Sequence, residues 1–230
     1  MRFKNKVKAG LAAALTLLAL GLSTGISAAQ TQSRPGEHVY LMRGAFNVFS
    51  LGLDQLAARL QQLGINVSVE NYLAWSRIVD EAAAEYRSGR VQNIILVGHS
   101  SGATAVTAVA ARLGELGVPV KLAIGLDPTT RTFAAGHVDR YVNFVAPGGM
   151  GTVVDRGRDF HGVLQNVTIT TAGHFDIDKN QALQDRVIAE IRTAVAGRPA
   201  RISAAPAARS AAGGAPASTR HAAYGQDRPQ

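Results

Sequence analysis

The sequence feature that most constrains the fold is the pentapeptide Gly98-His99-Ser100-Ser101-Gly102. An apolar run at 94–97 precedes it and a helix-like pattern follows it, so the serine is expected on a tight turn between a strand and a helix. Such a turn pushes the serine hydroxyl out of the sheet edge. The flanking glycines are needed because a Cβ at either position would collide with a neighbouring strand or helix. This context predicts a nucleophile at Ser100, and the alternative is a small polar residue at an ordinary turn.

Strand-like and helix-like stretches alternate through the middle of the chain. Strands are predicted at 38–42, 66–70, 93–97, 120–126, 141–145 and 166–170, and helical stripes at 53–63, 75–86, 106–113 and 183–191. This alternation predicts an α/β fold with a mainly parallel sheet of about six strands and helices on both faces. Chemistry in such sheets collects at the carboxyl ends of the strands.

Two further residues are candidates for activating the serine. A serine hydroxyl is a weak nucleophile until a histidine takes its proton, and a carboxylate must hold the other ring nitrogen. Hydrolases that use this turn place the three residues in the chain order serine, acid, histidine. Asp127 directly follows a predicted strand, and His174 lies between the last strand and the closing helix. The alternatives are an Asp-Pro turn at 127 and a structural histidine at 174.

These motifs resemble those of the α/β-hydrolase superfamily over residues 38–196, in a reduced form close in size to cutinase-like enzymes. The resemblance implies a three-layer sandwich and a Ser100–Asp127–His174 triad. The segment 125–128 is similar to the acid site of pancreatic-type lipases. Most of the superfamily places the acid one strand later, where this chain has no carboxylate before Asp155. Asp155 is therefore the reserve candidate for the acid.

The same resemblance implies an oxyanion hole built from two backbone N–H groups. One belongs to the residue after the nucleophile, which is Ser101. The other belongs to the loop after the first strand, where Ala45 is the expected donor and Phe46 the alternative. The glycine-rich loop 148–151 could border the pocket, and its alternative is an ordinary connection.

The resulting functional hypothesis is a serine hydrolase that cleaves an ester or thioester through an acyl-enzyme. The alternatives are an amide or peptide hydrolase and a non-catalytic binding protein on the same fold. The expected partner is a small-molecule or lipid-like acyl substrate. No cofactor is implied, since the chain lacks the glycine and lysine patterns of nucleotide-binding loops. The other histidines show no metal-ligand spacing and are interpreted as structural or solvated: His38, His99, His137, His161 and His221.

The two ends of the chain differ from the middle. Residues 1–29 have a basic start, a short apolar stretch and small residues at the end, the pattern of a secretory signal peptide. Residues 36–197 are expected to form one hydrolase-like domain. Residues 198–230 are rich in Ala, Pro and Arg and are predicted to be disordered. The sequence thus predicts an exported protein, periplasmic or secreted.

The positive charge does not predict nucleic-acid binding. The formal net charge is +8, of which the leader contributes +4 and the tail +4, so the middle is neutral overall. The leader's apolar stretch is shorter than the roughly 20 residues of a membrane span, so no stable span is expected after cleavage. The chain has no cysteine, so its stability is expected to come from the core. The oligomeric state is left open.

Overall fold

A computed structural model describes residues 36–45 and 50–196 of the chain. The predicted signal peptide and the predicted tail lie outside the described residues. No helix in the described part is long and apolar enough to cross a bilayer.

Six parallel strands form the main sheet, which confirms the predicted α/β class. Their spatial order is β2-β1-β3-β4-β6-β8. The strands are β1 (Gly36–Arg43), β2 (Val67–Asn71), β3 (Val91–His99), β4 (Leu122–Leu126), β6 (Arg140–Val145) and β8 (Val163–Thr168). The central strands are buried on both faces and read as continuous apolar runs, as parallel strands covered by helices do.

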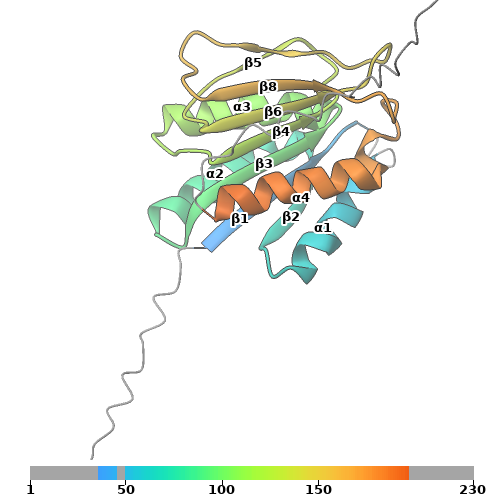
Figure 1. Ribbon diagram of the computed structural model, residues 1–230. Helices are drawn as coiled ribbons and strands as arrows, with labels where there is room; N and C mark the ends of the chain where they lie inside the picture. Colours follow the sequence, from blue (N-terminus) through green and yellow to red (C-terminus); the bar gives the residue numbers. More distant parts are fainter. Residues whose placement is uncertain (1–35, 46–49, 197–230) are drawn as a thin grey trace, which may run out of the picture.

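Helices cover both faces of this sheet and make three layers (Figure 1). The helices α1 (Gly52–Gln62) and α4 (Gln181–Val195) pack on one face, and α2 (Trp75–Arg87) and α3 (Ser101–Glu115) pack on the other. The 3-10 turns η2 (Tyr72–Ala74) and η3 (Ile177–Lys179) precede α2 and α4. Each α-helix buries one stripe of apolar residues, as the helical spacing predicted.

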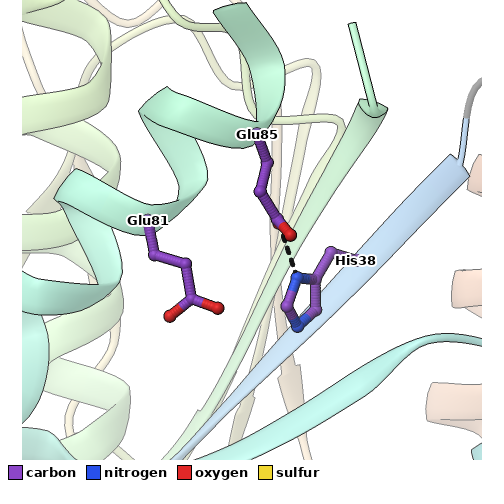
Figure 2. Close-up of side chains that lie close together, drawn as sticks. All are labelled: His38, Glu81 and Glu85. Atoms are coloured by element: carbon purple, nitrogen blue, oxygen red, sulfur yellow. Dashed lines mark hydrogen bonds and ion pairs between the residues drawn. The ribbon is translucent and has the colours of Figure 1, made fainter. Parts of the chain in front are cut away.

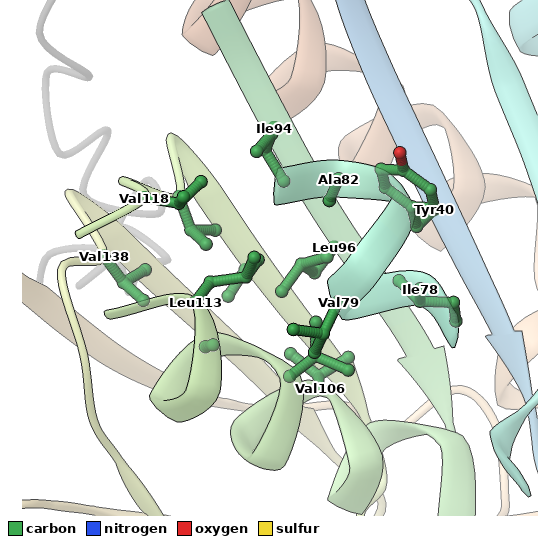
Figure 3. Close-up of a cluster of buried hydrophobic side chains, with 14 of the residues drawn as sticks. Tyr40, Ile78, Val79, Ala82, Ile94, Leu96, Val106, Leu113, Val118 and Val138 are labelled. Atoms are coloured by element: carbon green, nitrogen blue, oxygen red, sulfur yellow. The ribbon is translucent and has the colours of Figure 1, made fainter. Parts of the chain in front are cut away.

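The core on the α2 and α3 side shows how these stripes meet the sheet (Figure 3). Ile78 and Val79 of α2 and Val106 of α3 approach Leu96 of β3, and all four side chains are buried. Burying apolar side chains of this size stabilises the fold by about 1.5–3 kcal/mol each. This packing holds α3, and with it the turn at its start, rigidly against β3.

The structure differs from the sequence-based prediction at several strand ends. β3 extends from Val91 to His99, beyond the predicted 93–97, because the polar residues in it still pair with β1. The first residues of the predicted strand 120–126 leave the sheet, and Val120 bridges Val138 instead. The last strand lies at Val163–Thr168 rather than 166–170. It is a half-exposed edge strand without a continuous apolar run. A small second sheet of β5 (Thr132–Ala134) and β7 (Val154–Arg156) was not predicted, because three-residue strands leave too short a pattern.

The strand order creates a crevice between β1 and β3. The chain leaves β1 toward α1 on one face and leaves β3 toward α3 on the other face. The loops that follow these two neighbouring strands therefore diverge at the carboxyl edge of the sheet. Open α/β sheets bind their ligands at such a switch point. Both Gly44 and Ser100 lie at this position.

Candidate active site

Ser100 occupies a strained turn between β3 and α3. Its backbone has φ 59° and ψ −125°, a region that non-glycine residues rarely adopt and that costs about 1–3 kcal/mol. A hydrogen bond from the Ser100 N–H to the Leu126 carbonyl, at 2.9 Å, helps to hold it there. Although Ser100 is the N-cap residue of α3, its hydroxyl makes no capping hydrogen bond. The hydroxyl is therefore available for chemistry.

The glycines on either side of this turn are required by close contacts, as the sequence predicted. A Cβ on Gly98 would overlap the carbonyl of Gly102, and a Cβ on Gly102 would overlap the carbonyl of Met42 at the end of β1. Gly44 is similarly constrained, since a Cβ there would lie 2.8 Å from the Cβ of Ser100. These contacts draw α3, β3 and the loop after β1 together around the serine.

Three of the predicted site residues form one hydrogen-bonded series. The hydroxyl Oγ of Ser100 lies 3.1 Å from Nε2 of His174, and Nδ1 of the same ring lies 2.7 Å from Oδ2 of Asp127. The imidazole can therefore accept the serine proton on Nε2 while its Nδ1–H donates to the carboxylate. Asp127 is fully buried and His174 is only 7% exposed, so little water competes for these bonds.

The Asp127 carboxylate is fixed from two directions. Oδ2 accepts from His174, and Oδ1 accepts the Ala146 backbone N–H at 2.8 Å. Its backbone also has a positive φ of 56°, which makes it, with Ser100, one of two described non-glycine residues in that region. Strain at both positions is typical of residues held by their surroundings for a function.

A glycine closes the site over this carboxylate. A Cβ on Gly151 would overlap the carboxylate atoms of Asp127, so only a residue without a side chain allows the loop to pack there. The predicted loop 148–151 thus borders the site in the structure, and Met150 lines the pocket beside Ser100.

Asp155, the reserve candidate for the acid, is engaged elsewhere. It lies in β7, where its carboxylate accepts a hydrogen bond from Arg131 Nε at 2.7 Å. The structure therefore brings Asp127, rather than Asp155, to the histidine.

The predicted oxyanion-hole residues also lie beside the serine. Ser101 is the first residue of α3, so its N–H belongs to the set that a helix leaves without intrahelical partners. Ala45 follows β1 and lines the same pocket. The alternative donor, Phe46, lies outside the described residues. The partial positive charge of the α3 N-terminus further favours an anion at this point.

His99 connects the two halves of the site, a role that the sequence did not indicate. It is 1% exposed; its Nε2 lies 2.8 Å from the backbone carbonyl of His174 and its Nδ1 lies 2.8 Å from Oγ of Ser50. Burial lowers the pKa of His99 to about 4, so this ring is neutral at physiological pH. Ser50 in turn accepts the Gly44 N–H at 3.0 Å. No spacing in the sequence marks Ser50 or Ala146, because both act through contacts between distant segments.

A pocket of about 390 Å³ opens onto the serine. Its lining includes the exposed apolar side chains of Met150 and Phe175, together with Ala45, Ser100 and His174. Phe175 also packs edge-on against the His174 ring, with centroids 5.2 Å apart. Elsewhere in the described part, the side chains of His38, Glu81 and Glu85 come together as possible metal ligands.

The chain was compared with known proteins. No protein-family model matches it, and no curated protein matches it in sequence. Among solved structures, it is similar to the type II thioesterase of the borrelidin biosynthetic cluster, with 12% identity and a TM-score of 0.47 over 69% of this chain and 96% of that chain. Human thioesterase 2 matches with 9% identity and a TM-score of 0.48 over the same shares. A putative α/β-superfamily hydrolase from Xanthomonas campestris matches with 18% identity and a TM-score of 0.41, again over 69% and 96%.

Proposed function

We propose that this protein is a serine hydrolase that cleaves an ester or a thioester through an acyl-enzyme on Ser100. The observation that supports this most directly is the unbroken series of hydrogen bonds from Ser100 through His174 to Asp127. The strained turn at Ser100 and the lack of a capping hydrogen bond from its hydroxyl fit the same function. An inert scaffold has no need for either strain or a buried carboxylate at this point.

The proposed reaction begins with attack of the Ser100 Oγ on the acyl carbonyl carbon. His174 Nε2 takes the hydroxyl proton, and Asp127 stabilises the imidazolium through Nδ1–H. The backbone N–H groups of Ala45 and Ser101 stabilise the oxyanion of the tetrahedral intermediate. His174 then protonates the leaving alcohol or thiol. In the second half, it activates a water molecule that releases the acid from the serine.

The pocket supports an acyl substrate of modest size. Its volume of about 390 Å³ lies near the lower end of the range for small-molecule sites. Met150 and Phe175 offer apolar surface to the acyl chain. Neither residue supplies a charged group, so a polar or charged acyl chain would be disfavoured. We therefore expect the highest kcat/KM on uncharged acyl groups.

A fluorophosphonate probe tests the serine mechanism. The wild-type protein should gain the mass of one phosphonyl group, and the Ser100→Ala variant should gain none. Ser88→Ala is the control that should label normally, since Ser88 ends α2 before the amino end of β3, whereas Ser100 follows the carboxyl end of that strand. A wild-type mass that stays unchanged after exposure to the probe would favour the binding-protein alternative. Hydrolysis rates on matched p-nitrophenyl esters, thioesters and p-nitroanilides would then rank ester, thioester and amide substrates.

We also propose that the protein is exported after cleavage of a signal peptide. The support is the pattern of residues 1–29, with Arg2 and three lysines before an apolar stretch and small residues at 27–29. N-terminal sequencing of the protein recovered from the cell envelope and the medium tests this. A mature protein that still begins at Met1 would contradict it.

A further inference from the structure

A second cluster of reactive side chains lies between β1 and α2 (Figure 2). His38 lies near the start of β1, and Glu81 and Glu85 lie one turn apart on α2, so both carboxylates face the strand. One ligand atom from each residue lies within 4.8 Å of the others. His38 is near the amino end of its strand, whereas Ser100 follows the carboxyl end of β3. The cluster is therefore separate from the candidate active site.

We propose that His38, Glu81 and Glu85 bind one divalent transition-metal ion of the zinc type, with its fourth position open to water. An imidazole and two carboxylates are a suitable ligand set for such an ion, which binds nitrogen and oxygen at about 2.0–2.2 Å. A tetrahedral site at those lengths separates its ligand atoms by about 3.3 Å. The ligand atoms lie within 4.8 Å of one another, so Glu81 needs to approach by up to about 1.5 Å, and His38 and Glu85 need to separate slightly from their present 2.7 Å. Side-chain rotation is enough for both movements.

The groups around His38 are arranged as an outer shell that would orient the ligands. Nε2 of His38 lies 3.1 Å from Oγ of Ser68, which can accept an Nε2–H when the ion occupies Nδ1. The hydroxyl of Tyr40 donates to Oε2 of Glu85 at 2.7 Å, and the Tyr40 ring stacks on His38 at a centroid distance of 3.9 Å.

An ion would reach the cluster from the side of Glu81, which is the most exposed of the three ligands. The side chains of His38 and Glu85 are 6% and 14% exposed, whereas Glu81 is 39% exposed and borders solvent. Arg77 contacts Glu81 at 3.6 Å but also pairs with Glu70, so releasing Glu81 leaves that arginine with a partner. Arg90 approaches Glu85 only at 4.0 Å. A divalent cation would therefore replace weak cationic contacts and neutralise two carboxylates.

Binding at this site changes the stability of the fold. Neutral His38 keeps its single ring proton, which moves from Nδ1 to Nε2 and donates to Ser68 Oγ when the ion occupies Nδ1. The ion links α2 to β1 only in the folded state, so it stabilises that state relative to the unfolded chain. The melting temperature should rise by about 5 °C or more at a zinc concentration one hundred times the dissociation constant.

Zinc titration of the full-length protein by calorimetry tests the proposal. We expect one equivalent to bind. Glu81→Gln should weaken binding at least tenfold and reduce the thermal shift at the same zinc concentration to about half or less, while it preserves the His38–Glu85 hydrogen bond. Glu115→Gln, an exposed glutamate paired with Arg112 on α3, is the matched control that should bind normally.

A second variant excludes zinc binding at the catalytic histidine. His174→Ala should keep the equivalent of zinc, and cobalt substitution should give the intense visible bands of a four-coordinate ion. Binding that survives Glu81→Gln unchanged, or that disappears in His174→Ala, would overturn the proposal. The proposal would also fail if the wild-type protein showed no saturable binding at zinc concentrations up to about 1 mM. A dissociation constant above that concentration is too weak for a site with three protein ligands.

Discussion

The ring nitrogen Nε2 of His99 donates a hydrogen bond to the backbone carbonyl of His174 at 2.8 Å. A carbonyl only accepts, and His99 is neutral, so Nδ1 carries no proton and must accept from the Ser50 hydroxyl. That hydroxyl oxygen then accepts the Gly44 N–H. Every bond in this series has one possible direction. It joins the loop that carries His174, the proposed catalytic base, to the loop that carries the proposed oxyanion donor Ala45.

Breaking this connection should lower turnover without preventing substrate binding. We expect His99→Leu to reduce kcat by about tenfold or more, which corresponds to about 1.4 kcal/mol, and to change KM little. His99→Gln can still donate to the His174 carbonyl and should recover part of the loss. Steady-state kinetics on a p-nitrophenyl ester, with circular dichroism as a check on folding, measure both effects. Equal kcat for the leucine and glutamine variants would assign His99 to packing alone.

The acid can be identified by comparing two carboxylates. Asp127→Asn keeps the size of the side chain but replaces one acceptor oxygen with an NH2 donor, so it cannot accept from both the Ala146 N–H and the His174 Nδ1–H. With the amide oxygen on Ala146, the NH2 group faces Nδ1 and favours the wrong tautomer of the imidazole. We expect kcat to fall by about 10³-fold or more. Asp155→Asn loses only its exposed pair with Arg131 and should retain nearly full turnover. A larger loss in the Asp155 variant than in the Asp127 variant would exchange their assignments.

Much of the site could be predicted because its candidate residues lie in short motifs next to clear strand and helix patterns of apolar residues. The apolar run before Gly98 and the helical stripe after Gly102 define the turn at Ser100 without any long-range contact. Asp127 and His174 follow strands, and parallel strands bring their carboxyl ends to one edge. The spatial order of the strands then decides which of these ends are neighbours.

The contacts that the sequence did not reveal depend on pairing between distant segments. Ser50 lies 49 residues from His99, and His38 lies 47 residues from Glu85, so neither pair forms a recognisable spacing. The interpretation of His99 and His38 as merely structural or solvated rested on that missing spacing. β5 and β7 were missed because strands of three residues leave too short a pattern in the sequence.

Two glycines of the loop over Asp127, Gly149 and Gly151, offer a matched pair of substitutions that tests how closely the loop packs on the carboxylate. Gly151→Ala places a methyl group on the Asp127 carboxylate, so either the loop or the acid must move, and we expect at least a tenfold loss of kcat. Gly149→Ala adds a methyl group whose nearest neighbours are 3.6 Å away, an ordinary contact, and should have little effect. Kinetics and melting temperatures of the two variants test this difference. Comparable activity in both would mean that the loop moves without disturbing the acid.

The buried His99 should make the protein less stable in mild acid. Burial lowers the pKa of His99 from 6.5, its value in the unfolded chain, to about 4 in the folded protein. Between pH 4 and 6.5 the unfolded chain therefore binds a proton at His99 that the folded protein does not bind. The stability from this residue is complete above pH 6.5 and is lost as the pH falls toward 4, by up to about 3 kcal/mol. His99→Gln should lack this dependence. Urea unfolding at several pH values measures it, and parallel curves for wild type and variant would refute it.

Asp178 should have the opposite effect over an overlapping range. Its side chain is buried, and Oδ2 accepts the Gly52 N–H at the start of α1. Oδ1 has no hydrogen-bond partner among the described residues. Burial raises the pKa of Asp178 from 3.8 to about 6, so the folded state holds its proton longer than the unfolded chain. The stability from this residue is present below pH 3.8 and is lost as the pH rises through 6.

Asp178→Asn should therefore stabilise the protein selectively at higher pH. Relative to wild type, the free energy of unfolding should improve by up to about 3 kcal/mol between pH 3.5 and pH 8, because the variant never buries a carboxylate. In the wild type, the effects of Asp178 and His99 oppose each other between pH 4 and 6. The variant should expose the His99 effect as a steeper rise of stability with pH. Asp176→Asn, which changes an exposed neighbour, is the control. If the free energy of unfolding of Asp178→Asn differed from that of wild type by the same amount at every pH, the buried carboxyl would not titrate in this range.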